Sequence, residues 1–123
     1  MGKSKLKNMD NPWVDIPVTS TVTIGSSATI SLAKNKEFIY VSLRDMVRAA
    51  QTNVGADMFE ATISGNIPDF YSQHICSYSG STAVLVNVFN SSSGTMTVTA
   101  RVIGAALPAN TKITARGILR IDN

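Results

Sequence analysis

Apolar and polar residues alternate along most of this 123-residue chain. Residues 95–103 place Met, Val and Ala at alternate positions with Thr or Arg between them, and residues 113–121 show a similar alternation. This period of two is typical of a β-strand that has one face in a core and the other in solvent. The same criterion predicts shorter strands at residues 13–16, 22–24, 28–32, 37–41, 58–63, 71–78 and 83–89.

Turn residues separate these strands at regular intervals. Gly25-Ser26-Ser27 follows residues 22–24 and predicts one hairpin, and Ser79-Gly80-Ser81 before residues 83–89 predicts a second. Residues 83–89, AVLVNVF, are mostly apolar, so we expect a central strand that is covered on both faces. Eight or nine short strands predict an all-β fold, an antiparallel β-sandwich that is jelly-roll-like.

One segment departs from the period of two. Apolar residues at positions 43, 46, 47 and 50 follow the three- and four-residue spacing of a helix. Ser42 stands three residues before Asp45, as in a capping box in which Asp replaces Glu. We therefore predict one short amphipathic α-helix over residues 42–51, which closes one end of the sandwich.

The composition describes one small domain with few charges. Charged residues make up 15% of the chain, below the roughly 25% that is average for soluble domains. Ser and Thr together number 26, so much of the surface is uncharged. We expect one β-sandwich domain over residues 13–123, with a surface suited to contact with neighbouring subunits. The single cysteine, Cys76, excludes an internal disulfide.

Positive charge is concentrated at the start of the chain. Lys3, Lys5 and Lys7 account for the net charge of +3, because the rest of the chain carries equal numbers of basic and acidic residues. We interpret residues 1–12 as a basic arm whose lysines bind a partner together with Trp13, which pins the arm to the domain. An acidic protein surface, a membrane or packaged nucleic acid would attract such an arm, and a solubilising tail is the alternative.

Candidate catalytic chemistry is sparse. His74 and Cys76 fall on one face of a predicted strand, with Asp69 as the nearest carboxylate. A metal site needs three or four ligands, and a nucleophile needs a base and an orienting group. A packed or surface histidine and a small core cysteine are the simpler interpretation. We therefore expect no enzymatic activity, no metal and no cofactor.

The folded part of the chain also lacks the signals of nucleic-acid and membrane binding. Its tyrosines have no neighbouring clusters of Arg or Lys, which a nucleic-acid surface combines with aromatic residues. Arg101, Arg116 and Arg120 suggest a stripe on the polar face of the last two strands, where contact with solvent or a subunit is the simpler role. No apolar run reaches the ~18 residues of a membrane span. Neither direct sequence-specific nucleic-acid recognition nor a membrane partner is expected.

Aromatic residues near predicted loops provide one candidate ligand site. Phe70, Tyr71 and Tyr78 are placed where an exposed ring can stack on a sugar. A position in the core is the alternative for each of them. These three residues are the candidates for binding a host surface glycan.

Three stretches of the C-terminal half carry a resemblance to a group of viral proteins. ISGNIP, TAVLVNVFNSSSGTMTVTARVIG and ALPANTKITARGILRI are similar in composition and strand order to the small jelly-roll heads of tailed-bacteriophage virion proteins. These include tail-fibre tips, baseplate receptor-binding heads and capsid decorations. The resemblance spans residues 60–121 and implies a homotrimer in which apolar and Thr-rich faces pack around a threefold axis.

The resemblance gives a first functional hypothesis and leaves two others open. No shaft or collagen-like repeat precedes the predicted head, which favours a small subunit bound to the capsid or tail. We therefore expect a virion structural protein, located in the particle, that contacts copies of itself and other virion proteins. A receptor- or carbohydrate-binding head and a cellular accessory or inhibitor domain are the alternatives.

Overall fold

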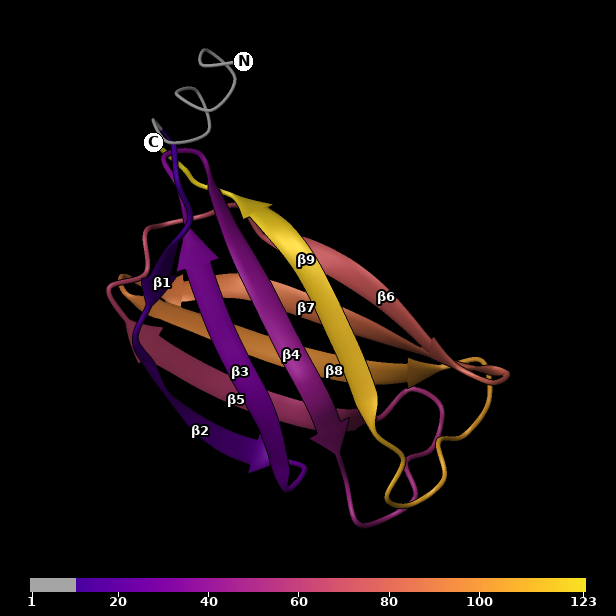
Figure 1. Ribbon diagram of the computed structural model, residues 1–123. Helices are drawn as coiled ribbons and strands as arrows, with labels where there is room; N and C mark the ends of the chain where they lie inside the picture. Colours follow the sequence, from indigo (N-terminus) through magenta and orange to yellow (C-terminus); the bar gives the residue numbers. More distant parts are fainter. Residues whose placement is uncertain (1–10) are drawn as a thin grey trace.

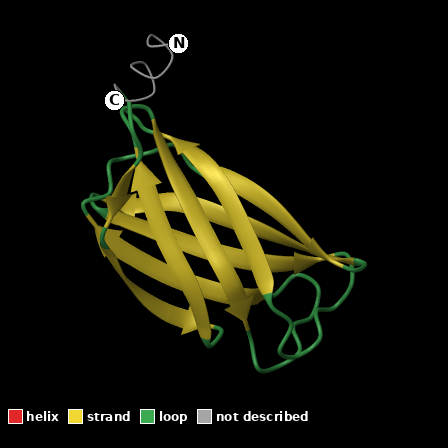
Figure 2. Ribbon diagram, viewed as in Figure 1, coloured by secondary structure: helices red, strands yellow, loops and turns green. Residues whose placement is uncertain are grey.

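The computed structural model describes residues 11–123, so the predicted arm residues Lys3, Lys5 and Lys7 lie outside the described residues. Within residues 11–123 the chain forms nine strands and no helix (Figures 1 and 2). The strands are β1 (Val14–Ile16), β2 (Val18–Ile24), β3 (Ser27–Lys34), β4 (Phe38–Val47), β5 (Asp57–Gly65), β6 (Gln73–Ser79), β7 (Thr82–Ser92), β8 (Thr95–Ile103) and β9 (Ile113–Arg120).

The strands build two antiparallel sheets that lie one over the other (Figure 1). The four-stranded sheet has the order β1-β3-β4-β9, and the five-stranded sheet has the order β2-β5-β8-β7-β6. The prediction of an all-β fold is confirmed. The arrangement is sandwich-like, and the strand order alone does not establish jelly-roll connections.

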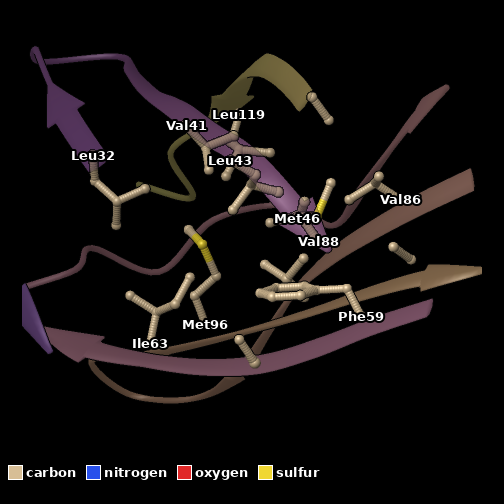
Figure 3. Close-up of a cluster of buried hydrophobic side chains, with 14 of the residues drawn as sticks. Leu32, Val41, Leu43, Met46, Phe59, Ile63, Val86, Val88, Met96 and Leu119 are labelled. Carbon is tan, nitrogen blue, oxygen red and sulfur yellow. The ribbon is translucent and has the colours of Figure 1, made fainter. Parts of the chain in front are cut away.

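The hydrophobic core lies between the two sheets, because alternate residues of each strand point inward. Figure 3 shows Val41, Leu43 and Leu119 extending from the four-stranded sheet toward Phe59 and Met96 of the five-stranded sheet. All five side chains are fully buried. Removal of such apolar surface from water, at about 25 cal/mol per Å², is the main force that holds the sheets together.

The two sheets are connected on both sides. β1 continues through Pro17 into β2, so the chain passes there from the four-stranded to the five-stranded sheet. On the opposite side β6 lies along β9, and the Ser77 hydroxyl donates a hydrogen bond of 2.8 Å to the Thr114 carbonyl oxygen. Gly117 permits this close approach, because a Cβ atom at that position would lie 2.6 Å from Ile75 Cδ1.

The hairpin predicted around Gly25 is wrong. β2 pairs with β5, whereas β3 pairs with β1 and β4, so this turn carries the chain between the sheets. The second predicted hairpin is confirmed, because β6 pairs with β7. β7 also pairs with β8 and is therefore central, but Leu85, Asn87 and Phe89 on its outer face are half-buried rather than covered.

The α-helix predicted over residues 42–51 is also wrong, because residues 42–47 continue β4 and a loop follows. β4 contains an irregularity between Leu43 and Met46 that shifts its register with β9. Leu43 and Met46 are therefore both buried although they lie three residues apart. A β-bulge thus reproduced the spacing of a helix over a short distance.

Candidate functional site

The outer surface of the four-stranded sheet gathers aromatic and apolar side chains. Phe38 and Tyr40 alternate with the core residues of β4, and Ile118 alternates with those of β9. Trp13 precedes β1 and contacts Tyr40. We call this surface the aromatic face, and its members are Trp13, Phe38, Tyr40, Arg116, Ile118 and Arg120.

The register of the strands explains how the aromatic face forms. Asp15 is opposite Ala33, Ala33 is opposite Tyr40, and Tyr40 is opposite Ile118, so one row crosses all four strands. Ala33 is the smallest side chain in this row and leaves space above β3. Trp13 and Tyr40 meet across it, with ring centroids 6.4 Å apart and ring planes at 70°. This edge-to-face arrangement is the one that aromatic quadrupoles favour.

The aromatic face has the composition of a protein contact surface. Trp13 is 48% exposed and Ile118 is 49% exposed, which is unusual for large apolar side chains. Arg116 and Arg120 flank Ile118 on the same side of β9 and are also exposed. Because Trp, Tyr and Arg are enriched in protein interfaces, this combination favours binding of another protein.

A hollow of about 420 Å³ continues the aromatic face at one end of the molecule. Phe38 and Arg120 belong to both, and the side chain of Tyr71 is 54% exposed there. The hollow is lined by Glu37, Phe38, Tyr71, Arg120, Ile121 and Asn123. It therefore combines aromatic rings with a guanidinium group and a carboxylate.

Backbone hydrogen bonds hold the walls of this hollow together. The Tyr71 N–H donates to the Arg120 carbonyl oxygen at 3.0 Å, and the Ile121 N–H donates to the Glu37 carbonyl oxygen at 2.9 Å. Phe70 forms an isolated β-bridge with Ile121 beneath them. Three segments that are distant in the sequence are therefore fixed relative to one another, which favours binding without rearrangement.

The phenol group of Tyr71 is also oriented by a side chain. Its hydroxyl donates a hydrogen bond of 3.0 Å to Asp122 Oδ1. This hydrogen bond, together with the negative charge of Asp122, raises the pKa of Tyr71, and the nearby Arg120 partly opposes the change. The ring is therefore neutral at physiological pH and is held in one position at the edge of the hollow.

The outer surface of the five-stranded sheet is rich in threonine. Thr21 is opposite Thr62, and Thr62 is opposite Thr97, so threonines form a row across β2, β5 and β8. Glu60 and Arg101 lie beyond them on the same side of the sheet. We call this surface the threonine face, and its members are Thr19, Thr21, Thr62, Thr95, Thr97 and Thr99.

The predicted ligand residues do not form one site. Phe70 is only 5% exposed and belongs to the core, so it is not available for stacking on a sugar. Tyr71 lines the hollow, whereas Tyr78 is 72% exposed at the other end of β6. Tyr71 and Tyr78 therefore both remain accessible, at separate places, and of the two Tyr71 lines a hollow. Of the predicted arm residues, Trp13 is described and lies on the aromatic face.

The other sequence candidates are also separated. His74 and Cys76 both lie exposed on the outer side of β6, opposite Asn87 and Leu85. Among residues 11–123, no three His, Cys, Asp or Glu side chains gather in a way that would hold a metal ion. The described part of the chain also has no helix long and apolar enough to cross a membrane.

The predicted arginine stripe is wrong. Arg101 lies on β8 in the five-stranded sheet, whereas Arg116 and Arg120 lie on β9 in the four-stranded sheet. The aromatic face was missed because its residues come from β4, from β9 and from the segment before β1, which the sequence does not show as neighbours. The outward position of Ile118 was detectable, since it alternates with Gly117 and Leu119 in the strand pattern.

Comparison with known proteins gives no relative from which a function could be transferred. No family model matches the chain, and neither a curated protein nor a solved structure matches it. The two outer faces and the hollow are therefore the features of the molecule that bear on its function.

Proposed function

We propose that this chain is a non-enzymatic structural subunit of a bacteriophage particle, which assembles with copies of itself and attaches to the capsid or tail through its N-terminal arm. The single observation that carries the proposal is the exposed aromatic face at the point where the arm joins the domain. The resemblance of residues 60–121 to phage jelly-roll heads supplies the viral context and the expectation of a trimer located in the virion.

The geometry around Asn11 supports the use of the arm and the aromatic face together. The Asn11 side-chain oxygen accepts a hydrogen bond of 2.9 Å from the Lys36 backbone N–H, which fixes the start of the described chain beside the β3–β4 turn. Trp13 follows two residues later and packs on Tyr40. A partner that binds the arm is therefore brought next to the exposed Trp13 and Ile118 side chains.

The threonine face supports contact between copies of the chain. Its members are uncharged and short, so a second flat surface that avoids the Glu60 carboxylate opposite Thr99 can approach without burying unpaired charge. Threonine hydroxyls can also exchange water for hydrogen bonds across such a contact. These properties agree with the Thr-rich packing that the resemblance implies for a trimer.

The proposal is tested by incorporation of variants into particles. Replacement of both apolar members of the aromatic face, Trp13→Ser with Ile118→Ser, is expected to lower the number of copies per particle about tenfold, which corresponds to ~1.4 kcal/mol of lost contact energy. Val54→Ser is the matched control, because Val54 is 54% exposed in a loop outside the face. Equal incorporation of the double variant and the control would contradict the proposal.

A second candidate function, recognition of a host glycan, is favoured by the hollow around Tyr71. An exposed ring beside a guanidinium group and a carboxylate can stack on the apolar face of a sugar and hydrogen-bond its hydroxyls. Tyr71→Ala should abolish binding on a glycan array, while Tyr78→Ala, at the other end of β6, should leave it unchanged. No glycan binding by the unmodified chain would exclude this function.

A further inference from the structure

β2 forms an edge of the five-stranded sheet, as Figure 1 shows. It pairs along one side with β5 and with no other strand of the described chain. The backbone groups on its other side therefore have no strand partner within residues 11–123. Thr19, Ser20 and Thr21 are exposed, including Ser20, which is opposite the core residue Ile63. Ser20 is therefore accessible although it lies on the inner side of β2 between Val18 and Val22, which pack against the core.

The other sheet edges of the described chain carry features that discourage pairing with another molecule. β1 is only three residues long, contains Asp15, and lies between Pro12 and Pro17. β6 and β9 lie along each other, so each covers the free edge of its neighbour. Short edges, charges, prolines and covering elements are the usual means by which proteins prevent edge association.

β2 has fewer of these features, since only Pro17, immediately before its first residue, adjoins it. Its seven residues, VTSTVTI, contain no charge and no proline. Its register with β5 is regular from Val18 to Val22, and an irregularity begins only after Val22. A regular, uncharged and exposed edge is a template for an added strand.

The sequence of the regular part of β2 also indicates which strand could be added at this edge. Val18-Thr19-Ser20-Thr21-Val22 reads the same in both directions. If two copies pair antiparallel about Ser20, Val18 faces Val22, Thr19 faces Thr21, and Ser20 faces Ser20. Paired β-branched residues and paired hydroxyl residues stabilise cross-strand contacts, and no like charges meet. A palindromic strand satisfies the self-complementarity that a twofold contact requires.

We propose that β2 pairs antiparallel with β2 of a second copy of this chain, centred on Ser20, which joins two five-stranded sheets into one sheet of ten strands. The inference goes beyond the proposed function, because a twofold contact joins copies in pairs, whereas the resemblance implies packing around a threefold axis. The contact extends the threonine face across two copies, because Thr19 and Thr21 belong to both features. It leaves the aromatic face free for a different partner.

Charge substitution at the twofold centre tests the pairing. Ser20→Lys places two like charges opposite each other and should convert the dimer to a monomer in light scattering, and Ser20→Glu should do the same. An equimolar mixture of the two variants should restore the dimer. Thr29→Lys is the matched control, because Thr29 is exposed on β3 in the other sheet, and it should remain dimeric.

A cross-link tests the register independently. In a Cys76→Ser background, which removes the exposed native thiol, Ser20→Cys should form an intermolecular disulfide on mild oxidation, and Thr97→Cys should not. A mixture of Thr19→Cys and Thr21→Cys should form mixed dimers in preference to either homodimer. The inference would be overturned if Ser20→Lys had the same mass in light scattering as the unmodified chain, or if positions 20 and 97 cross-linked equally.

These results are separable from the test of the proposed function. The edge variants leave Trp13 and Ile118 intact, and the aromatic-face variants leave β2 intact. A chain that dimerises through Ser20 but does not enter particles refutes the virion proposal alone. A chain that enters particles through the aromatic face but shows no Ser20 contact refutes the edge pairing alone.

Discussion

The ring of Trp13 packs edge to face against Tyr40, with centroids 6.4 Å apart and planes at 70°. This contact ties the residue before β1 to the middle of the four-stranded sheet. Because the pair is partly exposed, Trp13→Ala should lower the free energy of unfolding by only about 1 kcal/mol. Trp13→Phe, which keeps a ring, should recover most of this loss. Urea denaturation measures both, and a loss as large as that of a core residue would contradict the assignment of Trp13 to the surface.

Gly65 should be far less tolerant of a side chain than Gly117. A Cβ atom at Gly65 would lie 2.6 Å from the Pro17 carbonyl oxygen, whereas at Gly117 it would meet the flexible end of Ile75 at the same distance. The Pro17 carbonyl oxygen belongs to the backbone and cannot rotate away, so Gly65→Ala should destabilise the fold by about 2 kcal/mol. Gly117→Ala should cost less, because Ile75 can change rotamer. Equal thermal midpoints for the two variants would show that the β1–β2 crossing is looser than described.

Asp45 occupies a backbone conformation that glycine adopts more easily. Its φ angle is 60°, at the irregularity in β4, and its N–H donates a hydrogen bond of 3.1 Å to Thr114 Oγ1. Asp45→Gly should therefore stabilise the fold by up to about 1 kcal/mol, because it relieves this strain without losing the N–H. Asp45→Val should destabilise it, since a β-branched residue is disfavoured at positive φ. Chemical denaturation of the two variants should give shifts of opposite sign.

Stability should decline in alkaline solution through Tyr71. The hydrogen bond to Asp122 raises the pKa of Tyr71 in the folded state, so the folded chain holds this proton more tightly than the unfolded chain. The resulting stabilisation is complete below the ordinary tyrosine pKa of about 10 and is lost as pH rises through the higher folded value. Asp122→Asn should lower the phenolate titration midpoint of Tyr71.

The control for this titration is Tyr78, because the neighbouring Cys76 side chain also raises its pKa. Spectra are therefore compared between Tyr71→Phe and Tyr78→Phe in the presence and absence of Asp122→Asn. The effect of Asp122→Asn should disappear only when Tyr71 is replaced. Persistence of the effect in Tyr71→Phe would show that Asp122 acts on another group.

The strand content and most strand positions could be predicted from the sequence, because apolar and polar residues alternate along a half-buried strand. Residues 95–103 and β8 coincide for this reason. Partner choice was not accessible, since the turn at Gly25 has the composition of a hairpin whether its strands pair or separate. The false helix at residues 42–51 has a local cause in the bulge after Leu43, which no period-based rule distinguishes from a helical turn.

Likewise, only part of the candidate site could be predicted from the sequence. Tyr71 and Tyr78 were selected as exposed aromatic residues, and both are exposed. Phe70 was selected by the same argument and is buried, because a bridge to Ile121 at the other end of the chain draws it inward. Long-range contacts of this kind decide which of two adjacent aromatic residues faces solvent. The local sequence around the two residues does not reveal these contacts.

The passage of the chain through Pro17 has a mechanical consequence. A pull on the N-terminal end of the described chain loads the Asn11 hydrogen bond and the Trp13–Tyr40 contact, and then β1, which is held to the sheet by only three paired positions. Once β1 has peeled away, the force reaches β2 and acts along its longer pairing with β5. The weaker β1–β3 pairing therefore breaks before the stronger β2–β5 pairing. Under such a force the chain can lose one short strand while its five-stranded sheet stays intact.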